Sequence, residues 1–464
     1  MQTRFSQAQL ADPATAHSEQ ILRKCVHCGF CTATCPTFVL LGDELDSPRG
    51  RIYLIKDMLE AGRPATEQVV KHIDRCLSCL SCMTTCPSSV NYMHLVDHAR
   101  AYIEDTYERP WHDRMLRRLL AAILPYPGRF RWAVRLSALG RPVAPLLSKG
   151  PAARLGAMLR LAPVSVPRAA PVARPHVAPA AGPRRKRVAL MTGCVQSVIA
   201  PDINAAAIRL LTRAGVEVVL PKGEGCCGAL VHHMGREDDA RAAARANIDA
   251  WWHEIERAGL DAIAITASGC GTTVKDYAHM LAGDPAYADR ANEVAARARD
   301  ITEVLADLDL GPPERQSGAV VAYHSACSMQ HGQQIKTEPR RLLADAGFEV
   351  AEVPEGHICC GSAGVYNILQ PDIAGQLKTR KVANIDRTGA DLVATGNIGC
   401  ITQIGSGTDR PIVHTVELLD WAHGGPLPRG LAGRADRLKE TAPTPGLVEG
   451  AEPTRQGVDV IATP

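Results

Sequence analysis

The sequence has no long apolar segment. No uninterrupted apolar run among its 464 residues approaches the roughly 20 residues that a helix needs to cross a bilayer. No window resembles a secretory signal peptide either. We therefore expect a protein that is made and kept in the cytoplasm.

Acidic residues are almost absent from the middle of the chain. Residues 109–187 contain 17 Lys and Arg residues and one acid, Asp113, although the whole chain carries a formal net charge of only +3. In WHDRMLRRLLAAIL, apolar residues recur at helical spacing between arginines, which predicts a basic amphipathic helix. They are Met115, Leu116, Leu119, Leu120 and Ile123. The Pro/Ala-rich remainder predicts an extended linker, and no nucleic-acid-binding motif accompanies the basic residues.

Cysteine, by contrast, is plentiful, with 16 residues. Because thiols stay reduced in the cytoplasm, this number predicts metal binding or redox chemistry and not disulfides. The cysteines form two internal repeats. In the first, at an offset of 51 residues, Cys25, Cys28, Cys31 and Cys35 become Cys76, Cys79, Cys82 and Cys86. In the second, Cys194, Cys226, Cys227 and Cys270 become Cys327, Cys359, Cys360 and Cys400, at offsets of 133 residues for the first three and 130 for the last.

The first repeat consists of KCVHCGFCTATCP and RCLSCLSCMTTCP, which fit the CxxCxxCxxxCP pattern of ferredoxins with two 4Fe–4S clusters. On that pattern the fourth cysteine ligates the other motif's cluster. The predicted ligand sets are Cys25, Cys28, Cys31 and Cys86 for one cluster, and Cys76, Cys79, Cys82 and Cys35 for the second. Zinc is the alternative, but structural zinc favours separated cysteine pairs. Between the motifs, SPRGRIYLIKDMLEAG predicts a helix whose Arg49 and Arg51 either offset the cluster charge or belong to a solvated face.

The second repeat alternates short apolar runs with helical patterns. Strands are predicted at 187–191, 216–220 and 261–266, with helices near 202–214 and 236–258. The same order recurs in AVVAY, FEVAEV and DLVAT and in the helical patterns between them. Each copy therefore predicts a small α/β unit with mostly parallel strands. Because all eight cysteines of this repeat follow strands, we expect four thiols to converge at the carboxyl edge of each sheet.

Each copy carries adjacent cysteines before a glycine, in GEGCCGAL and ICCGSAG, and we call the copies CCG units. Neighbouring α-carbons, about 3.8 Å apart, are too close for an unstrained disulfide. A dinucleotide-binding loop is excluded because the second copy loses the middle glycine and neither copy has the acidic residue that would hold a ribose. A thiolate-ligated cluster or a redox-active thiol group remains. The candidate ligands or proton carriers nearby are His232, His233, His324 and His331.

These motifs together resemble the iron–sulfur subunits of glycolate oxidase (glycolate dehydrogenase) complexes, most clearly in SPRGRI, TGCVQ, CCGAL, ASGCG, CCGSAG and GNIGC. The resemblance spans residues 18–424 and extends more distantly to the third subunit of anaerobic glycerol-3-phosphate dehydrogenase and to heterodisulfide reductase subunits. In the heterodisulfide reductase pattern an additional cysteine completes a CxxC pair, and a complete unit can hold a non-cubane 4Fe–4S cluster. Here Ala267 and Asn397 stand in its place, so each unit keeps four thiols.

The resemblance implies that FAD in partner subunits oxidises glycolate to glyoxylate, while this chain relays electrons toward a membrane quinone or another acceptor. It implies no catalytic acid, base or nucleophile in this chain. The basic segment is expected to contact either a flavoprotein or the anionic inner face of the cell membrane. The alternatives are the equivalent subunit for glycerol 3-phosphate or lactate, a thiol–disulfide redox protein, and a zinc-stabilised scaffold.

The expected fold class is α+β and multidomain. A helical, two-cluster ferredoxin-like domain is expected at residues 1–108, followed by the basic segment and its linker at 109–187. The two tandem α/β CCG units should span 188–312 and 313–425. A flexible tail is predicted for 426–464.

Overall fold

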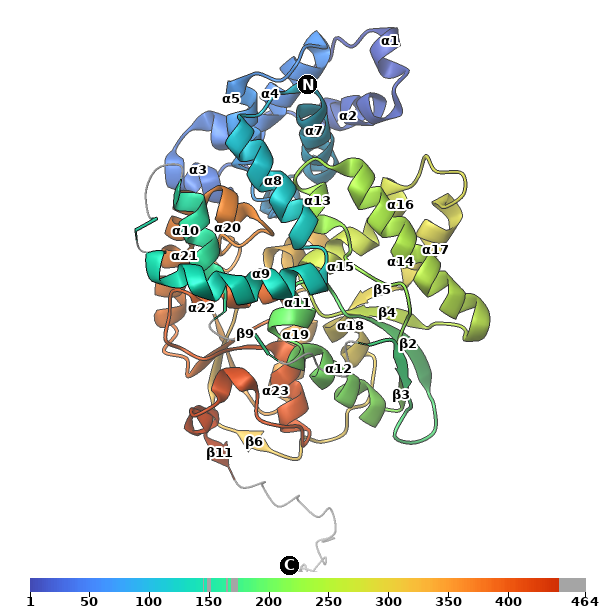
Figure 1. Cartoon of the computed structure of the whole chain (residues 1–464), viewed down its shortest axis with the longest axis vertical. Helices are drawn as coiled ribbons and strands as arrows, with labels where there is room; N and C mark the ends of the chain where they lie inside the picture. Colours follow the sequence, from blue (N-terminus) through green and yellow to red (C-terminus); the bar gives the residue numbers. More distant parts are fainter. Residues whose placement is uncertain (145, 148–151, 164–165, 168–173, 442–464) are drawn as a thin grey trace, which may run out of the picture.

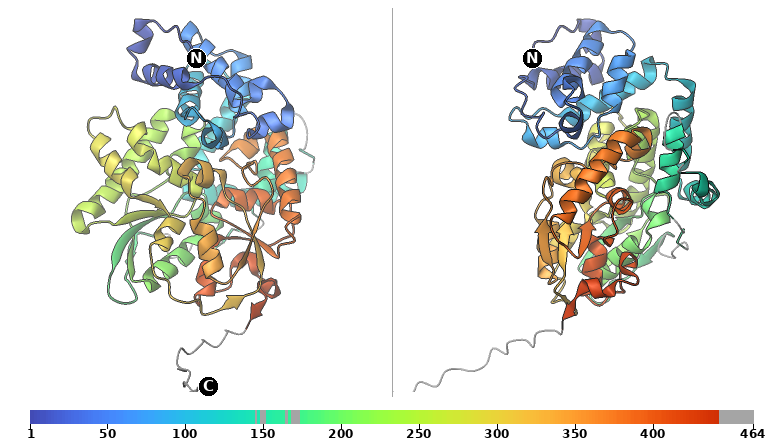
Figure 2. Two further views of the ribbon diagram at one scale, coloured as in Figure 1. Left: turned by 180° about the vertical axis from the view of Figure 1, so that it is seen from behind. Right: turned by 90° about the vertical axis from the view of Figure 1, so that its left-hand side faces the viewer.

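The computed structural model describes residues 1–144, 146–147, 152–163, 166–167 and 174–441. A helical amino-terminal domain lies at one end of the molecule, above two α/β units that stand side by side (Figures 1 and 2). None of the helices in these ranges is both long enough and apolar enough to span a membrane.

The amino-terminal domain is built from short helices around an apolar centre. They are α1 (Gln7–Leu10), α2 (Pro13–Lys24), α3 (Pro36–Leu41), the 3-10 turn η1 (Glu44–Asp46), α4 (Pro48–Ala61), α5 (Glu67–Asp74), α6 (Ser81–Thr85) and α7 (Tyr92–Thr106). Local chemistry sets their starts. Both α2 and α4 begin with a proline, and the side chains of Asp12 and Ser47 cap them. The apolar faces of α2, α4, α5 and α7 meet in one buried cluster.

The basic segment forms a helical layer on the outside of both units (Figure 2). It contains α8 (Trp111–Ile123), α9 (Pro127–Gly140), the 3-10 turn η2 (Arg141–Val143) and α10 (Ala153–Leu161). The predicted amphipathic helix is thus present as α8, with Leu120 buried and Met115 and Leu119 exposed. The predicted linker includes a short strand. Its strand β1 (His176–Ala178) pairs antiparallel with β3 (Val216–Leu220), and its residues 164–165 and 168–173 lie outside the described residues.

The two CCG units contain sheets with the same strand order. The strands are β2 (Lys186–Met191), β3, β4 (Ala262–Ile265) and β5 (Ala298–Asp300) in the first unit, and β7 (Val320–Tyr323), β8 (Glu349–Glu352), β9 (Leu392–Thr395) and β10 (Ile412–His414) in the second. The first sheet runs β1-β3-β2-β4-β5 and the second β10-β9-β7-β8. Every pair in these two sheets except β1–β3 is parallel. The predicted pair of mostly parallel α/β units is confirmed.

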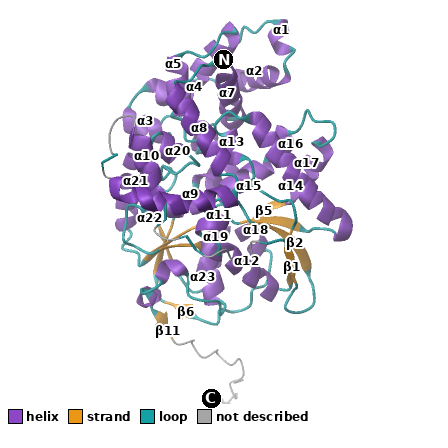
Figure 3. Cartoon of the chain, in the orientation of Figure 1, coloured by secondary structure: helices purple, strands orange, loops and turns teal. Residues whose placement is uncertain are grey.

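Helices cover both sheets (Figure 3). The first unit has α11 (Gln196–Ile199), α12 (Asp202–Arg213), α13 (Ala229–His232), α14 (Glu237–Ala258), α15 (Ser268–Lys275), α16 (Tyr277–Met280), α17 (Ala288–Arg297) and α18 (Ile301–Ala306). The second has a π-helix, η5 (Ser328–Gln333), followed by α19 (Glu338–Asp345), α20 (Tyr366–Leu369), α21 (Pro371–Asp386), α22 (Ile398–Gly405) and α23 (Thr415–Ala422). Helix α12 of the first unit packs on α23 of the second, and α19 of the second unit packs on α18 of the first in the same way. One apolar cluster runs through both units. The duplicated units therefore share a core.

The flexible tail predicted from residue 426 onward is wrong for its first part. Residues 426–441 fold back on the second unit through η6 (Arg429–Leu431), η7 (Ala435–Leu438) and β11 (Glu440–Thr441), which pairs antiparallel with β6 (Gln316–Ser317). Leu431 and Leu438 join the shared core, and burial of these two side chains offsets the cost of ordering a polar segment. Residues 442–464 lie outside the described residues.

Candidate functional site

The first cysteine motif folds into a tight turn around a small cavity. This cavity is lined by Cys25, Cys28, Cys31, Cys82 and Cys86. In the turn, His27 and Gly29 have left-handed backbone, with φ of 54° and 85°. The second motif repeats this conformation 51 residues later, at Ser78 and Leu80, with φ of 48° and 61°. A left-handed leucine is uncommon, and turns of this kind direct backbone N–H groups toward an anionic centre.

The second motif lines a neighbouring cavity. Its cysteines are Cys35, Cys76, Cys79 and Cys82. Because Cys82 lines both cavities, the two adjoin. The structure brings Cys86 to the first motif and Cys35 to the second. Each predicted set of four thiols therefore lines one cavity, and four thiols are the donor set of a 4Fe–4S cluster. The crossed ligand assignment itself stays a prediction.

Arg51 of α4 is buried beside the second cavity. Its side chain is 1% exposed, its Nη1 lies 3.7 Å from Cys35 Sγ, and its Nη2 donates to the buried Asp46 at 3.3 Å. Arg49 lines the first cavity but is partly exposed and pairs with Glu44 at 2.7 Å. Of the two arginines, Arg51 therefore places a desolvated positive charge directly against a predicted ligand.

The two cavities differ in exposure. Cys28 of the first is exposed, whereas all four thiols that line the second are buried. Burial raises the pKa of both Cys79 and Cys82 well above the ordinary value of a thiol. Thiolates at these positions need a compensating cation, which iron would supply. The first cavity thus faces solvent and the second faces the interior.

All eight cysteines of the CCG units line one cavity of about 310 Å³. In the second unit two pairs of thiols approach each other closely. The Sγ atoms of Cys327 and Cys359 are 3.6 Å apart, and those of Cys360 and Cys400 are 3.5 Å apart. The predicted convergence of thiols after the strands is therefore present, with both units facing a common space. Whether they bind a cluster stays a prediction.

In the first unit the thiol of Cys226 interacts with its neighbours Cys194 and Cys227. Hydrogen bonds from Cys194 and Cys227 lower the pKa of Cys226 to about 4. This favours the thiolate, which is the form that binds metal. Two residues earlier, the buried carboxyl group of Glu224 accepts a hydrogen bond from the backbone N–H of Thr192 at 2.7 Å, and burial raises its pKa to about 7.

The glycine after each cysteine pair is required by close packing. Gly228 and Gly361 have φ of +88° and +89°. A Cβ atom on Gly361 would lie 2.7 Å from the carbonyl oxygen of Ala374 in α21. Only glycine allows the turn and the following helix to approach this closely.

The four candidate histidines have different surroundings. His324 lies among the thiols of the second unit. His331 instead hydrogen-bonds a threonine of α6 at 2.8 Å. His232 and His233 lie 3.3 and 3.9 Å from Asp97 of α7. Three of the four therefore contact the amino-terminal domain. His233 also lines the cavity shared by the CCG units, but only His324 lies with two thiols in a group that could hold a metal ion, within the described residues.

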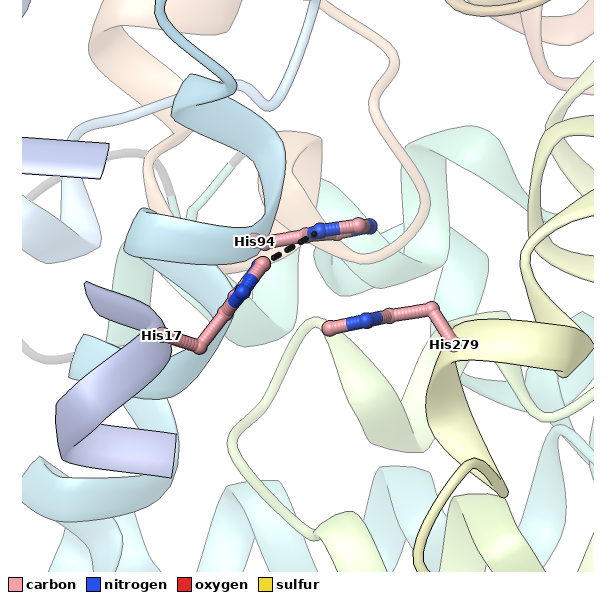
Figure 4. Close-up of side chains that lie close together, drawn as sticks. All are labelled: His17, His94 and His279. Carbon is pink, nitrogen blue, oxygen red and sulfur yellow. Dashed lines mark hydrogen bonds between the residues drawn. The ribbon is translucent and has the colours of Figure 1, made fainter. Parts of the chain in front are cut away.

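A cluster of three other histidines joins the amino-terminal domain to the first unit (Figure 4). His17 Nε2 of α2 lies 3.3 Å from His94 Nδ1 of α7, and the ring of His94 stacks on His279 of α16 with centroids 3.5 Å apart. His94 Nε2 also lies 2.8 Å from Asp276. Burial, with the neighbouring His94, lowers the pKa of His279 to about 4. No local pattern predicts this cluster, because its members come from three distant segments.

The second motif docks directly on the second CCG unit. Cys79 and Cys359 belong to one apolar cluster, which also contains Leu77 and Tyr366. The Tyr366 hydroxyl donates to the carbonyl oxygen of Arg75 at 3.0 Å, which fixes the contact. We call the two cavities of the cysteine motifs the ferredoxin-type cavities, and the cavity lined by all eight thiols of the CCG units the CCG cavity. The second ferredoxin-type cavity is therefore packed against the wall of the CCG cavity.

Lys381 of α21 is a residue of the CCG site that sequence reasoning missed. It is 1% exposed, and its Nζ donates to the carbonyl oxygen of Glu355 at 3.0 Å. Burial lowers its pKa, and the nearby thiols, Cys360 first among them, oppose that shift. A signal existed in the sequence, since Lys381 lies four residues from both Leu377 and Ile385, on the apolar stripe of its helix.

Comparison with known proteins gives the family. Residues 21–90 match the family model described as a 4Fe-4S dicluster domain, and residues 188–275 and 321–405 match that of a cysteine-rich domain, CCG. The glycolate oxidase iron–sulfur subunit of Escherichia coli K12 is 40% identical over 422 residues, which cover 91% of this chain and 99% of that protein. The chain belongs to the family of glycolate oxidase iron–sulfur subunits. The resemblance inferred from the motifs is thus confirmed.

One further relative supports this family, and two others show a more distant likeness. The probable glycolate oxidase iron–sulfur subunit of Bacillus subtilis 168 is 33% identical, over 87% of this chain and 94% of that protein. Lactate utilization protein A of Oceanobacillus iheyensis is 28% identical, over 50% of this chain and 96% of that protein. The crystal structure of a hypothetical protein from Helicobacter pylori has a similar fold, with a TM-score of 0.54 at 10% identity over 93% of this chain and 76% of that one.

Proposed function

We propose that this chain is the electron-transfer subunit of a flavin-dependent glycolate oxidase. The observation that carries the proposal is the series of adjoining cysteine-lined cavities. Cys82 lines both ferredoxin-type cavities, and Cys79 of the second packs with Cys359 of the CCG cavity. The series runs from the exposed Cys28 to the interior of the molecule.

The ferredoxin-type cavities would hold two 4Fe–4S clusters, on the two crossed sets of cysteines. When bound, each cluster supplies a one-electron centre, which suits a two-electron flavin donor on a partner subunit. The chain's own residues would hold these centres in place, shield the second one from solvent and tune its charge. Leu77 and Tyr366 exclude water between the second cavity and the CCG thiols, and Arg51 places its cation beside Cys35.

Glycolate is favoured over lactate by the extent of the likeness. The glycolate oxidase subunits match nearly the whole chain, whereas the lactate utilization protein matches half of it. We propose that the glycolate-oxidising site and its FAD lie on partner flavoproteins, and that this chain contributes no acid, base or nucleophile to that step.

Substrate-dependent reduction tests this assignment. When the chain is purified anaerobically with its flavoprotein partners, we expect glycolate to bleach the visible absorption of the clusters, because electrons leave the flavin through them. Lactate and glycerol 3-phosphate should have little effect. Bleaching by glycerol 3-phosphate and not by glycolate would assign the chain to the other dehydrogenase, and zinc without acid-labile sulfide would exclude the electron relay.

We further propose that α9 rests on the anionic inner leaflet of the cell membrane. One face of α9 exposes Trp132, Leu136 and Leu139, which are 64%, 61% and 81% exposed and lie at the spacing of a single helical stripe. Arg129 and Arg135 are exposed on the same helix. Apolar side chains flanked by arginines are typical of helices that bind a lipid interface.

The opposite side of α9 links this surface to the redox cavity. Phe130 and Val134 line the CCG cavity together with Leu124, which caps the end of α8. A lipid-soluble acceptor such as a quinone would therefore reach the CCG thiols through apolar surroundings beneath α9. This arrangement supports a membrane quinone over a soluble acceptor.

Vesicle binding tests the membrane contact. We expect the double variant Leu136→Ser/Leu139→Ser to bind vesicles containing anionic phospholipid about tenfold more weakly or worse, because two exposed leucines lose their apolar burial in the interface. Cosedimentation measures the binding. The matched control is Leu427→Ser, an exposed leucine outside the basic segment. Unchanged vesicle binding with loss of the flavoprotein would reassign α9 to the subunit interface.

A further inference from the structure

The side chain of His324 is buried without a hydrogen-bond partner. It directly follows β7 and is 2% exposed. Its backbone N–H donates to the carbonyl oxygen of Ala394 at 2.9 Å, but within the described part of the chain neither Nδ1 nor Nε2 of its ring has a partner. Leaving a buried polar atom without a partner is unfavourable, so an imidazole in this state calls for a ligand.

The ring lies close to two thiols of the second unit. A ring nitrogen of His324 and the Sγ atoms of Cys360 and Cys400 all lie within 4.8 Å of one another. The two sulfurs are 3.5 Å apart. Thiolates that share one tetrahedral metal ion with bonds of about 2.3 Å are separated by about 3.8 Å, so this pair is already near ligand spacing. An imidazole beside two thiols is a donor set for iron or zinc.

The first unit lacks this nitrogen. The offset of 133 residues that relates Cys194 to Cys327 places Met191 at the position of His324. Met191 is buried in an apolar cluster of the first unit. The thiols of the two units therefore correspond, while the side chain three residues before the first thiol differs in its ability to bind metal.

We infer that the second CCG unit builds an iron site of mixed ligation, in which His324 supplies a ring nitrogen alongside the thiolates of Cys360 and Cys400. The first unit has no nitrogen donor at the equivalent position, where Met191 stands. The inference rests on the proposed function, because it takes the centre in this unit to be an electron carrier. Residues of the second unit are the ones in contact with Cys79, so this site is the next one after the second ferredoxin-type cavity.

Mixed ligation gives the site a role in the direction of electron flow. Exchanging thiolates for neutral imidazoles raises the reduction potential of an iron–sulfur centre, as in Rieske centres. The buried ammonium group of Lys381 acts in the same direction, since its electrostatic partners are the four thiols of this unit. Both effects make the second unit a stronger electron acceptor than a site with thiolate ligands alone, which would draw electrons away from the ferredoxin-type clusters.

The variant His324→Met tests the inference, because methionine is the residue that the first unit already accommodates at this position. The full chain, purified anaerobically and reduced with dithionite, is examined by pulsed electron paramagnetic resonance. We expect the unmodified protein to show the hyperfine coupling of a directly bound ¹⁴N nucleus, changed by ¹⁵N-histidine labelling, and His324→Met to lose it. The midpoint potential of that centre should fall or its iron should be lost.

Further variants keep the outcome decisive. His324→Cys should retain iron in the second unit without nitrogen coupling, which separates ligand exchange from misfolding. Cys360→Ser should remove the coupled signal. The inference would be overturned if the nitrogen coupling survived in His324→Met, or if the unmodified protein held iron in the second unit without this coupling. It would also be overturned if Cys360→Ser left the iron content unchanged. Intact coupling without reduction by glycolate would refute the proposed function alone.

Discussion

Replacing Cys86 by serine is expected to remove the cluster of the first motif, although Cys86 belongs to the second. Replacing Cys35 is expected to remove the cluster of the second motif. Each change takes away one of four thiolates from a Cys₄ site, so the iron and acid-labile sulfide content of the anaerobically purified chain should fall by about four atoms each. The cavities support this crossing, because Cys86 lines the first and Cys35 the second.

The matched comparison uses one uncrossed ligand from each motif. Cys28→Ser should leave the same residual electron paramagnetic resonance spectrum as Cys86→Ser, and Cys79→Ser the same as Cys35→Ser. If Cys28→Ser and Cys35→Ser instead give matching spectra, each motif holds its own cluster and the crossed assignment is wrong. The comparison does not depend on full activity, because it reads which cluster remains.

Much of the site follows from sequence spacing. The tandem cysteine motifs predict two adjoining cavities because a ligand spacing constrains a few neighbouring residues. In the structure, the two residues with left-handed backbone in the first turn recur in the second at an offset of 51 residues. The strands of the CCG units were predicted for a similar reason. Their apolar runs are buried on both sides, as in β2 and β4, and such runs are distinctive.

The parts that could not be predicted depend on contacts between distant segments. β1 has three residues and gains its conformation only by pairing with β3. Leu431 and Leu438 are isolated apolar residues in a polar segment, and nothing local shows that they enter the shared core. The position of the amino-terminal domain is likewise fixed by single long-range contacts, such as that of Tyr366 with the Arg75 carbonyl group. The secondary-structure propensity of a segment carries no information about which distant segment it will contact.

The positive charge of Arg51 is expected to raise the reduction potential of the cluster in the second ferredoxin-type cavity. Arg51→Met removes a positive charge whose Nη1 lies 3.7 Å from Cys35 Sγ, in an environment with 1% exposure. At an effective dielectric constant near 20, a unit charge at this distance interacts by about 4 kcal/mol with a full charge on the sulfur, and by less with an electron spread over a cluster. We therefore expect the midpoint potential to fall by on the order of 100 mV in an anaerobic redox titration.

The same substitution also tests whether Arg51 is structural. Its loss leaves the buried carboxylate of Asp46 with His72 at 2.9 Å and Arg75 at 2.7 Å, so that some stability is lost but Asp46 keeps partners. Arg51→Lys keeps the charge and should restore most of the potential, whereas Arg49→Met, at a partly exposed and screened position, should shift the potentials much less. If Arg51→Met folds, retains iron and leaves both potentials unchanged, the guanidinium group stabilises the fold around Asp46 and does not tune the cluster.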